Sequence, residues 1–184
     1  GVYVHGKTIG IVGAGRIGQA TARRARGFGM KIIYWGPRRK PEAERELGME
    51  HVSLERLLTE ADFVSLHPPL NAETHHMISD AQFALMKPTA FIINTARGAV
   101  IDEKALVRAL KKKRIAGAGL DVFEHEPKLP PALKTTKNVV LTPHLGSAVM
   151  EVREQMANIV VDNLQALISG GTPPNCVNPQ VLGR

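Results

Sequence analysis

Residues 7–18 read Lys-Thr-Ile-Gly-Ile-Val-Gly-Ala-Gly-Arg-Ile-Gly, and their pattern is the strongest indication of the fold. An apolar run ends in three glycines spaced G-x-G-x-x-G, at Gly13, Gly15 and Gly18, and an amphipathic run over residues 17–28 follows. The order of strand, tight turn and helix is the context in which this spacing indicates a dinucleotide site, whereas the glycines alone would fit an ordinary turn. The first glycine permits the turn, the second lets the backbone approach a pyrophosphate, and the third lets helix and strand pack closely.

The remaining chain alternates apolar runs with amphipathic ones. We expect strands over residues 9–12, 30–35, 62–66, 90–94, 115–120 and 138–142, and helices over residues 17–28, 53–60, 79–86, 103–113 and 147–168. This alternation predicts an α/β fold of the Rossmann type, a doubly wound parallel sheet with helices on both faces. Ser53, Ser79 and Asp102 are the expected N-caps of three of these helices.

Composition narrows the class of protein. The chain has 184 residues, 43% of them hydrophobic, and a net charge of +7 from 24 basic and 17 acidic residues. The basic clusters raise the possibility of nucleic-acid binding, but only 4% of the residues are aromatic and no nucleic-acid recognition motif is present. We therefore expect no nucleic-acid partner and no membrane span. The single cysteine, Cys176, is read as inert, and a cytosolic chain is the simplest interpretation.

The end of the second predicted strand bears on the choice of coenzyme. An NAD-selective site needs an acidic residue there to accept hydrogen bonds from the ribose hydroxyls. Residues 34–40 read Tyr-Trp-Gly-Pro-Arg-Arg-Lys, so Gly36 stands without a carboxylate and Arg38 and Arg39 follow. These arginines can bind a 2′-phosphate, which predicts a preference for NADP(H) with NAD(H) possible. A solvated basic loop is the alternative.

In an open parallel sheet, ligands bind beyond the carboxyl ends of the strands. Polar side chains that could bind a ligand or take part in catalysis follow four of the predicted strands: His67, Arg97, Asp121 and His144. A cation, a carboxylate and an imidazole are thereby expected along one edge of the sheet. Taken singly, each residue also fits an ordinary loop or strand-end position, and His67 fits a packed histidine as well as a coenzyme contact.

Three further motifs carry a resemblance. Residues 94–98 read Asn-Thr-Ala-Arg-Gly, residues 119–127 read Gly-Leu-Asp-Val-Phe-Glu-His-Glu-Pro, and residues 142–147 read Thr-Pro-His-Leu-Gly-Ser. Together with the glycine motif they resemble the D-isomer-specific 2-hydroxyacid dehydrogenases over essentially the whole chain. With Gly36 and its following arginines, the resemblance within that family is strongest to the glyoxylate/hydroxypyruvate reductases.

The resemblance implies a role for each residue of the edge. Arg97 would bind the substrate carboxylate, His144 would donate a proton to the carbonyl oxygen as hydride arrives, and Glu126 would hold the imidazole. Asp121 would hold the nicotinamide carboxamide. The catalytic residues implied are Arg97, Glu126 and His144. The coenzyme contacts expected are Gly13, Gly15, Arg16, Ile17, Gly18, Gly36, Arg38, Arg39, Thr95, Ala96, Asp121 and Gly146. No metal is expected, and His75, His76, Glu124 and His125 are read as surface residues.

The resemblance also implies a domain arrangement. Residues 1–172 would form the dinucleotide-binding domain, and residues 173–184 would begin the return to a substrate domain that this chain otherwise lacks. We expect NADPH-dependent reduction of glyoxylate or hydroxypyruvate to the D-2-hydroxy acid, weak turnover by this chain alone, and a homodimer. The alternatives are an NAD-dependent D-2-hydroxyacid dehydrogenase with another substrate, or a dinucleotide-sensing interaction protein of the corepressor kind.

Overall fold

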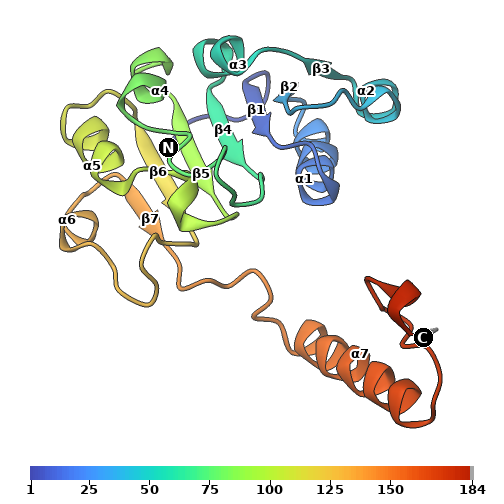
Figure 1. Ribbon diagram of the computed structural model, residues 1–184. Coiled ribbons are helices and arrows are strands. Elements are labelled where there is room, and N and C mark those ends of the chain that lie inside the picture. Colours follow the sequence, from blue (N-terminus) through green and yellow to red (C-terminus); the bar gives the residue numbers. More distant parts are fainter. Residues whose placement is uncertain (183–184) are drawn as a thin grey trace. The chain divides into compact units, whose positions relative to one another are not determined.

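The structure is a computed structural model that describes residues 1–182. The chain divides into two compact units, residues 1–143 and a second unit that begins at His144 (Figure 1). Each unit is described by itself.

The first unit is built on a parallel sheet. Its strands within the described residues are β1 (Thr8–Val12), β2 (Lys31–Trp35), β3 (Met49–His51), β4 (Phe63–Leu66), β5 (Phe91–Asn94), β6 (Gly117–Leu120) and β7 (Val139–Leu141). They lie in the order β3-β2-β1-β4-β5-β6-β7 and all pair in parallel, with Ile9 opposite both Ile32 and Phe63. The chain reverses its direction of travel across the sheet between β1 and β4, the point where such sheets bind ligands. The predicted Rossmann-type fold is confirmed.

Helices connect the strands (Figure 1). They are α1 (Arg16–Gly27), α2 (Pro41–Leu47), α3 (Leu54–Glu60), α4 (Asp80–Leu85), α5 (Glu103–Lys111) and α6 (Pro131–Lys134). The predicted caps Ser53 and Asp102 accept hydrogen bonds from the backbone N–H groups of Arg56 and Ala105, and Ser79 forms a capping box with Gln82. The sequence analysis missed the short elements α2, β3 and α6.

The core consists of two apolar clusters, one on each face of the sheet. Successive residues of β2 divide between them, because side chains of a strand alternate between faces. Ile32 and Tyr34 pack with the buried residues of α1 and α2, whereas Ile33 packs with Leu57 of α3 and Phe83 of α4. Helices therefore cover both faces, as the doubly wound arrangement requires.

The second unit contains a long helix, α7 (Met150–Ile168), and a short turn of helix, η2 (Pro179–Val181). The predicted start at residue 147 is three residues early, since Val149 has an extended backbone with φ −120° and ψ 134°. The Asn163 side chain of α7 bonds Asn175 twice, at 3.0 and 3.1 Å, which ties the segment after the helix to it. Among the described helices, none is both long enough and apolar enough to cross a membrane.

Candidate functional site

The glycine turn after β1 has the close contacts that its sequence predicts. Gly13 has φ +93°, and a Cβ there would lie 2.8 Å from the backbone of His67 and Pro68. A Cβ at Gly18 would lie only 2.2 Å from the carbonyl oxygen of Gly13. Gly15, in contrast, has nothing within 4 Å of its Cβ position. Two of the three glycines are therefore required by the fold, and the third leaves open space beside the backbone.

That open space lies at the N-terminus of α1. Gly15 is the N-cap residue and supplies no side-chain cap, and the first turn of the helix has no acidic residue. Arg16 and Ile17 are both exposed there. Unsatisfied N–H groups and the positive end of the helix dipole make such a terminus an anion site. The geometry fits a pyrophosphate, because a side chain at position 15 would fill the space that the phosphate needs.

The edge beyond β2 carries the predicted basic residues. A Cβ at Gly36 would lie 4.0 Å from the backbone nitrogen of Ala14, so this residue borders the glycine turn. Arg38 is exposed and, within residues 1–182, takes part in no ion pair. Arg39 instead binds Glu44 of α2 through two hydrogen bonds, Nη2 to Oε2 at 2.6 Å and Nε to Oε1 at 3.2 Å.

Glu44 is tied to the core as well as to Arg39. The buried Tyr34 donates its hydroxyl hydrogen to Glu44 Oε1 at 2.6 Å and accepts from the Lys40 N–H at 2.7 Å. Arg39 and Tyr34 together lower the pKa of Glu44 to about 2. Burial raises the pKa of Tyr34, and the hydrogen bond to Glu44 acts in the same direction. A hollow of about 310 Å³ lies beside this network, lined by Gln19, Arg39, Lys40, Pro41, Glu42, Ala43 and Arg45.

The turn after β5 holds Arg97 in place. The buried Asn94 closes this turn, because its side chain donates to the Arg97 carbonyl and accepts from the Ala96 N–H, both at 3.0 Å. Thr95 and Arg97 are exposed at the edge of the sheet, and Arg97 Nη1 donates to the Ala96 carbonyl at 2.6 Å. The guanidinium therefore projects from an internally bonded turn, where a carboxylate substrate can reach it.

Gly98 brings the turn after β5 against the loop after β6. A Cβ at Gly98 would lie 1.9 Å from the carbonyl carbon of Phe123, so only glycine fits at this contact. The Phe123 N–H donates to Glu126 Oε1 at 3.0 Å, which holds the Glu126 carboxylate near its own loop. The loops that carry Arg97 and Glu126 thus lie against each other, as the predicted grouping requires.

Asp121 lies at the junction of β6 and β7. It is buried, its N–H donates to the Asn94 carbonyl at 3.0 Å, and its Oδ1 accepts from the Thr142 hydroxyl at 2.6 Å. A buried carboxylate anchored in this way is well fixed in position, which suits the predicted role of holding a carboxamide.

Two predicted residues belong to the second unit. His144 is its first residue, is exposed and has φ +54°, a left-handed conformation that few residues other than glycine adopt. Gly146 follows and is also exposed. Their grouping with Arg97 and Glu126 stays a prediction.

His67 lies between the two interpretations left open by the sequence. It is half-buried, its Nε2 lies 2.9 Å from the Ser65 hydroxyl, and burial lowers its pKa. Its backbone also forms one wall of the Gly13 turn. The structure therefore shows a packed histidine beside the glycine turn, and a contact between His67 and the coenzyme stays a prediction.

Sequence reasoning missed one pair in this region. His75 and His125 are exposed, as expected, but His76 and Glu124 are half-buried and lie 2.7 Å apart, Nε2 to Oε1. They are separated by 48 residues, so no local pattern joins them.

The comparison with protein families agrees with this geometry. Residues 1–146 match the model described as "D-isomer specific 2-hydroxyacid dehydrogenase, NAD binding domain". The chain belongs to this family. The match contains the glycine turn, Arg97, Asp121, Glu126 and His144.

Curated relatives and solved structures extend the match over nearly the whole chain. A glyoxylate reductase of Thermococcus litoralis is 60% identical over 182 residues, which cover 99% of this chain and 55% of the relative. One of Pyrococcus furiosus is 56% identical and covers 99% of this chain and 54% of the relative. The crystal structure of a glyoxylate reductase from Paecilomyes thermophila has a TM-score of 0.89 and 45% identity, covering 98% of this chain and 55% of that one. The chain thus spans about half the length of these relatives.

Two substitutions in the glycine turn are expected to have different effects, one on the stability of the first unit and the other on coenzyme binding. Gly13→Ala forces a side chain into a backbone contact at positive φ, and we expect it to destabilise the first unit by more than about 1 kcal/mol. Gly15→Ala enters open space at φ −76°, and we expect it to change stability by less than about 0.5 kcal/mol while abolishing dinucleotide binding. Thermal unfolding and a coenzyme titration of both variants test this. Unchanged coenzyme affinity in Gly15→Ala would contradict the phosphate site.

The Glu44 network predicts a pH-dependent stability. The folded-state pKa of about 2 lies below the ordinary value of 4.5, so Glu44 binds fewer protons when folded. Its contribution is therefore present above about pH 5 and is lost as the pH falls toward 2. We expect the difference in thermal midpoint between the parent and Glu44→Gln to be largest near neutral pH and to shrink below about pH 5. Glu42→Gln, outside the ion pairs of residues 1–182, is the control, and a pH-independent difference for Glu44→Gln would refute the effect.

Proposed function

We propose that this chain is the coenzyme-binding and catalytic-residue domain of an NADPH-dependent enzyme that reduces a small 2-keto acid, glyoxylate or hydroxypyruvate, to the D-2-hydroxy acid. The observation that carries the proposal is the pairing of a glycine turn suited to pyrophosphate with Arg97 on the same edge of the sheet. Relatives at 56–60% identity that are named glyoxylate reductase support the substrate class.

Each residue of the proposed site has its own role in the reaction. When bound, the nicotinamide coenzyme supplies the hydride. Arg97 binds the substrate carboxylate through its planar guanidinium and so orients the keto group. His144 donates a proton to the carbonyl oxygen, and Glu126 holds the imidazole in position. Asp121, which is held in place by Thr142 and by the backbone of Asn94, accepts a hydrogen bond from the carboxamide.

The preference for NADPH rests on the edge beyond β2. A carboxylate at position 36 would repel a 2′-phosphate, and Gly36 has none. Arg38 is exposed beside it and has no competing ion pair within residues 1–182. The hollow nearby is lined by Arg39, Lys40 and Arg45 against the single acidic Glu42, so positive charge remains in excess there even though Arg39 is paired with Glu44.

A second candidate is an NAD-dependent dehydrogenase of another D-2-hydroxy acid. It is favoured by the similarity to the crystal structure of D-lactate dehydrogenase with NAD⁺ from Lactobacillus jensenii, with a TM-score of 0.86 and 34% identity over 94% of this chain and 56% of that one. The relative affinity for NADPH and NADH distinguishes the two candidates.

A coenzyme titration tests the proposal. Trp35, the only tryptophan, ends β2, and its fluorescence can report binding through energy transfer to reduced nicotinamide. We expect NADPH to bind more tightly than NADH, and Arg38→Ala to weaken NADPH by roughly 10-fold with little effect on NADH, because a charged hydrogen bond to phosphate is lost. Arg24→Ala, on the exposed surface of α1, is the matched control. NADH binding as tightly as NADPH would favour the second candidate. Turnover of glyoxylate by this chain is expected to be weak, since it spans about half of its relatives.

We also propose that the chain forms a homodimer through α7. Within its own unit this helix buries no residue and carries a stripe of exposed apolar side chains, Val152, Met156, Val160, Leu164 and Leu167. Glu151, Glu154, Asn158 and Asp162 lie on the opposite face of the helix. A stripe of this kind needs a partner surface, and a second copy of α7 presents the same one.

Sedimentation tests the dimer. We expect a mass of two protomers of 20.0 kDa each for the parent chain. Met156→Glu places a charge in the apolar stripe and should give one protomer, whereas Asn158→Glu on the opposite face should leave the dimer intact. A parent chain that sediments as one protomer would refute the proposal.

A further inference from the structure

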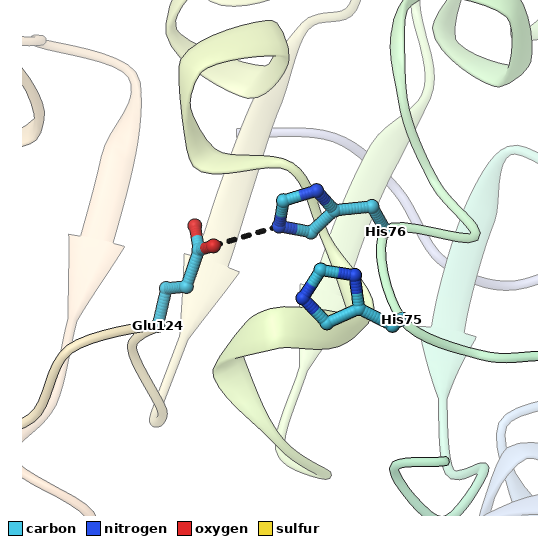
Figure 2. A group of neighbouring side chains, drawn as sticks. All are labelled: His75, His76 and Glu124. Carbon is cyan, nitrogen blue, oxygen red and sulfur yellow. Dashed lines mark hydrogen bonds and ion pairs between the residues drawn. The ribbon is translucent and has the colours of Figure 1, made fainter. Parts of the chain in front are cut away.

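A group of three polar side chains lies outside the residues assigned to coenzyme and substrate. His75 and His76 lie in the segment between β4 and α4, and Glu124 follows β6 (Figure 2). Each offers one ligand atom, an imidazole nitrogen or a carboxylate oxygen, and these atoms all lie within 4.8 Å of one another. The imidazole rings stack, with centroids 4.0 Å apart and an angle of 26° between their planes.

The backbone is arranged to bring these side chains together. His76 has φ +51°, in the left-handed region that few residues other than glycine adopt, and this places two successive imidazoles side by side. Three hydrogen bonds fix the segments: His75 N–H to the Asn71 carbonyl at 2.9 Å, His76 N–H to the Ala99 carbonyl at 2.8 Å, and Glu124 N–H to Glu103 Oε1 at 2.9 Å. Uncommon backbone geometry that persists in an anchored turn points to a function.

The surrounding charge favours a cation. Glu124 lies beside the buried Glu103, whose Oε1 accepts a hydrogen bond from the Glu124 N–H at 2.9 Å, so two carboxylates lie close together here. The described ion pairs give Glu124 one partner, His76, which is cationic only when protonated. A divalent ion would compensate both carboxylates without requiring that proton. Glu124 also lines an open groove of about 1200 Å³, which gives an ion a path to the group.

We propose that His75, His76 and Glu124 bind a divalent transition-metal ion of the zinc type. Two imidazoles and one carboxylate form a ligand set that zinc accepts, with water in the fourth position of a tetrahedron. Calcium and magnesium prefer sets made of oxygen ligands, so the two imidazoles select against them.

The geometry needs only small adjustments to hold the ion. Ligands about 2.0–2.1 Å from a tetrahedral metal lie roughly 3.3 Å from one another. The Nε2–Oε1 distance of 2.7 Å would lengthen slightly, and the other ligand separations, all within 4.8 Å, would adjust to the same value. The exposed His75 can rotate toward the other two. The metal takes the place of the hydrogen between His76 Nε2 and Glu124 Oε1, and the neutral imidazole then carries its one N–H on Nδ1.

An ion here would link segments that are distant in sequence. It would join the chain after β4 to the chain after β6, and His76 already contacts the loop after β5 through Ala99. Glu124 lies two residues before Glu126. The ion would therefore stabilise the loops at the carboxyl edge of the sheet. The proposal does not depend on the coenzyme or on the reaction.

Zinc titration of the chain without a histidine tag tests the site. The protein is stripped with a chelator, carries Cys176→Ser to remove its thiol, and is titrated with Zn²⁺ by calorimetry. We expect one ion per chain. Zn²⁺ at roughly 100 times its Kd should raise the thermal midpoint by roughly 5–10 °C. With Co²⁺ in place of zinc, a visible absorption band of tetrahedral type is expected.

Two variants and a control decide whether these residues are the ligands. His75→Ala removes an exposed side chain and should weaken zinc binding at least ~10-fold without unfolding the protein. Glu124→Gln keeps a hydrogen-bond acceptor for His76 but loses the carboxylate, and should weaken zinc binding similarly. His125→Ala, adjacent in sequence but outside the group, should bind zinc as the parent does. Equal affinity in His75→Ala and the parent, or no saturable binding by the parent, would leave His76 and Glu124 as a hydrogen-bonded pair only and overturn the proposal.

Discussion

The backbone of α1 passes so close to the turn after β1 that no side chain fits between them. A Cβ at position 18 would lie 2.2 Å from the carbonyl oxygen of Gly13, far inside any van der Waals contact. This one approach fixes the direction in which α1 leaves the strand. It thereby places Ala22 and Ala25 against the sheet and aims the uncapped N-terminus of the helix at the carboxyl edge. The apolar cluster on this face and the anion site depend on the same contact.

The same kind of constraint recurs at the other end of the edge. Gly98 lies against the backbone of Phe123, where a Cβ would be 1.9 Å from the carbonyl carbon. The turn after β5 and the loop after β6 are thereby held together, although Arg97 and Glu126 are far apart along the chain. Polar side chains then lock each loop internally, Asn94 in the first and Glu126 in the second. Glycine sets the spacing, and buried or partly buried hydrogen bonds set the orientation.

The sequence predicted the features that local patterns encode. Apolar runs predicted every strand of the sheet except β3, because a parallel strand covered on both faces is apolar throughout. The edge strand β3 has three residues, one of them the exposed Glu50, so it carries no such pattern. Polar pairs between residues distant in sequence could not be predicted from local patterns either. His76 and Glu124 lie 48 residues apart, and each alone is typical of a surface. The resemblance to a family supplied the roles of Arg97, Glu126 and His144, which no spacing in the sequence could.

The two arginines after β2 have different surroundings in the structure. From sequence, Arg38 and Arg39 are equivalent cations, but Arg39 uses Nε and Nη2 to bind Glu44, which is itself fixed by Tyr34. A guanidinium has five N–H donors, so the Nη1 edge of Arg39 remains for a phosphate. Glu44 thus orients Arg39 and at the same time cancels much of its charge. Arg38 has neither restraint within residues 1–182. The proposed preference for a 2′-phosphate therefore rests mainly on the charge of Arg38, whereas Arg39 would contribute a fixed orientation more than electrostatic attraction.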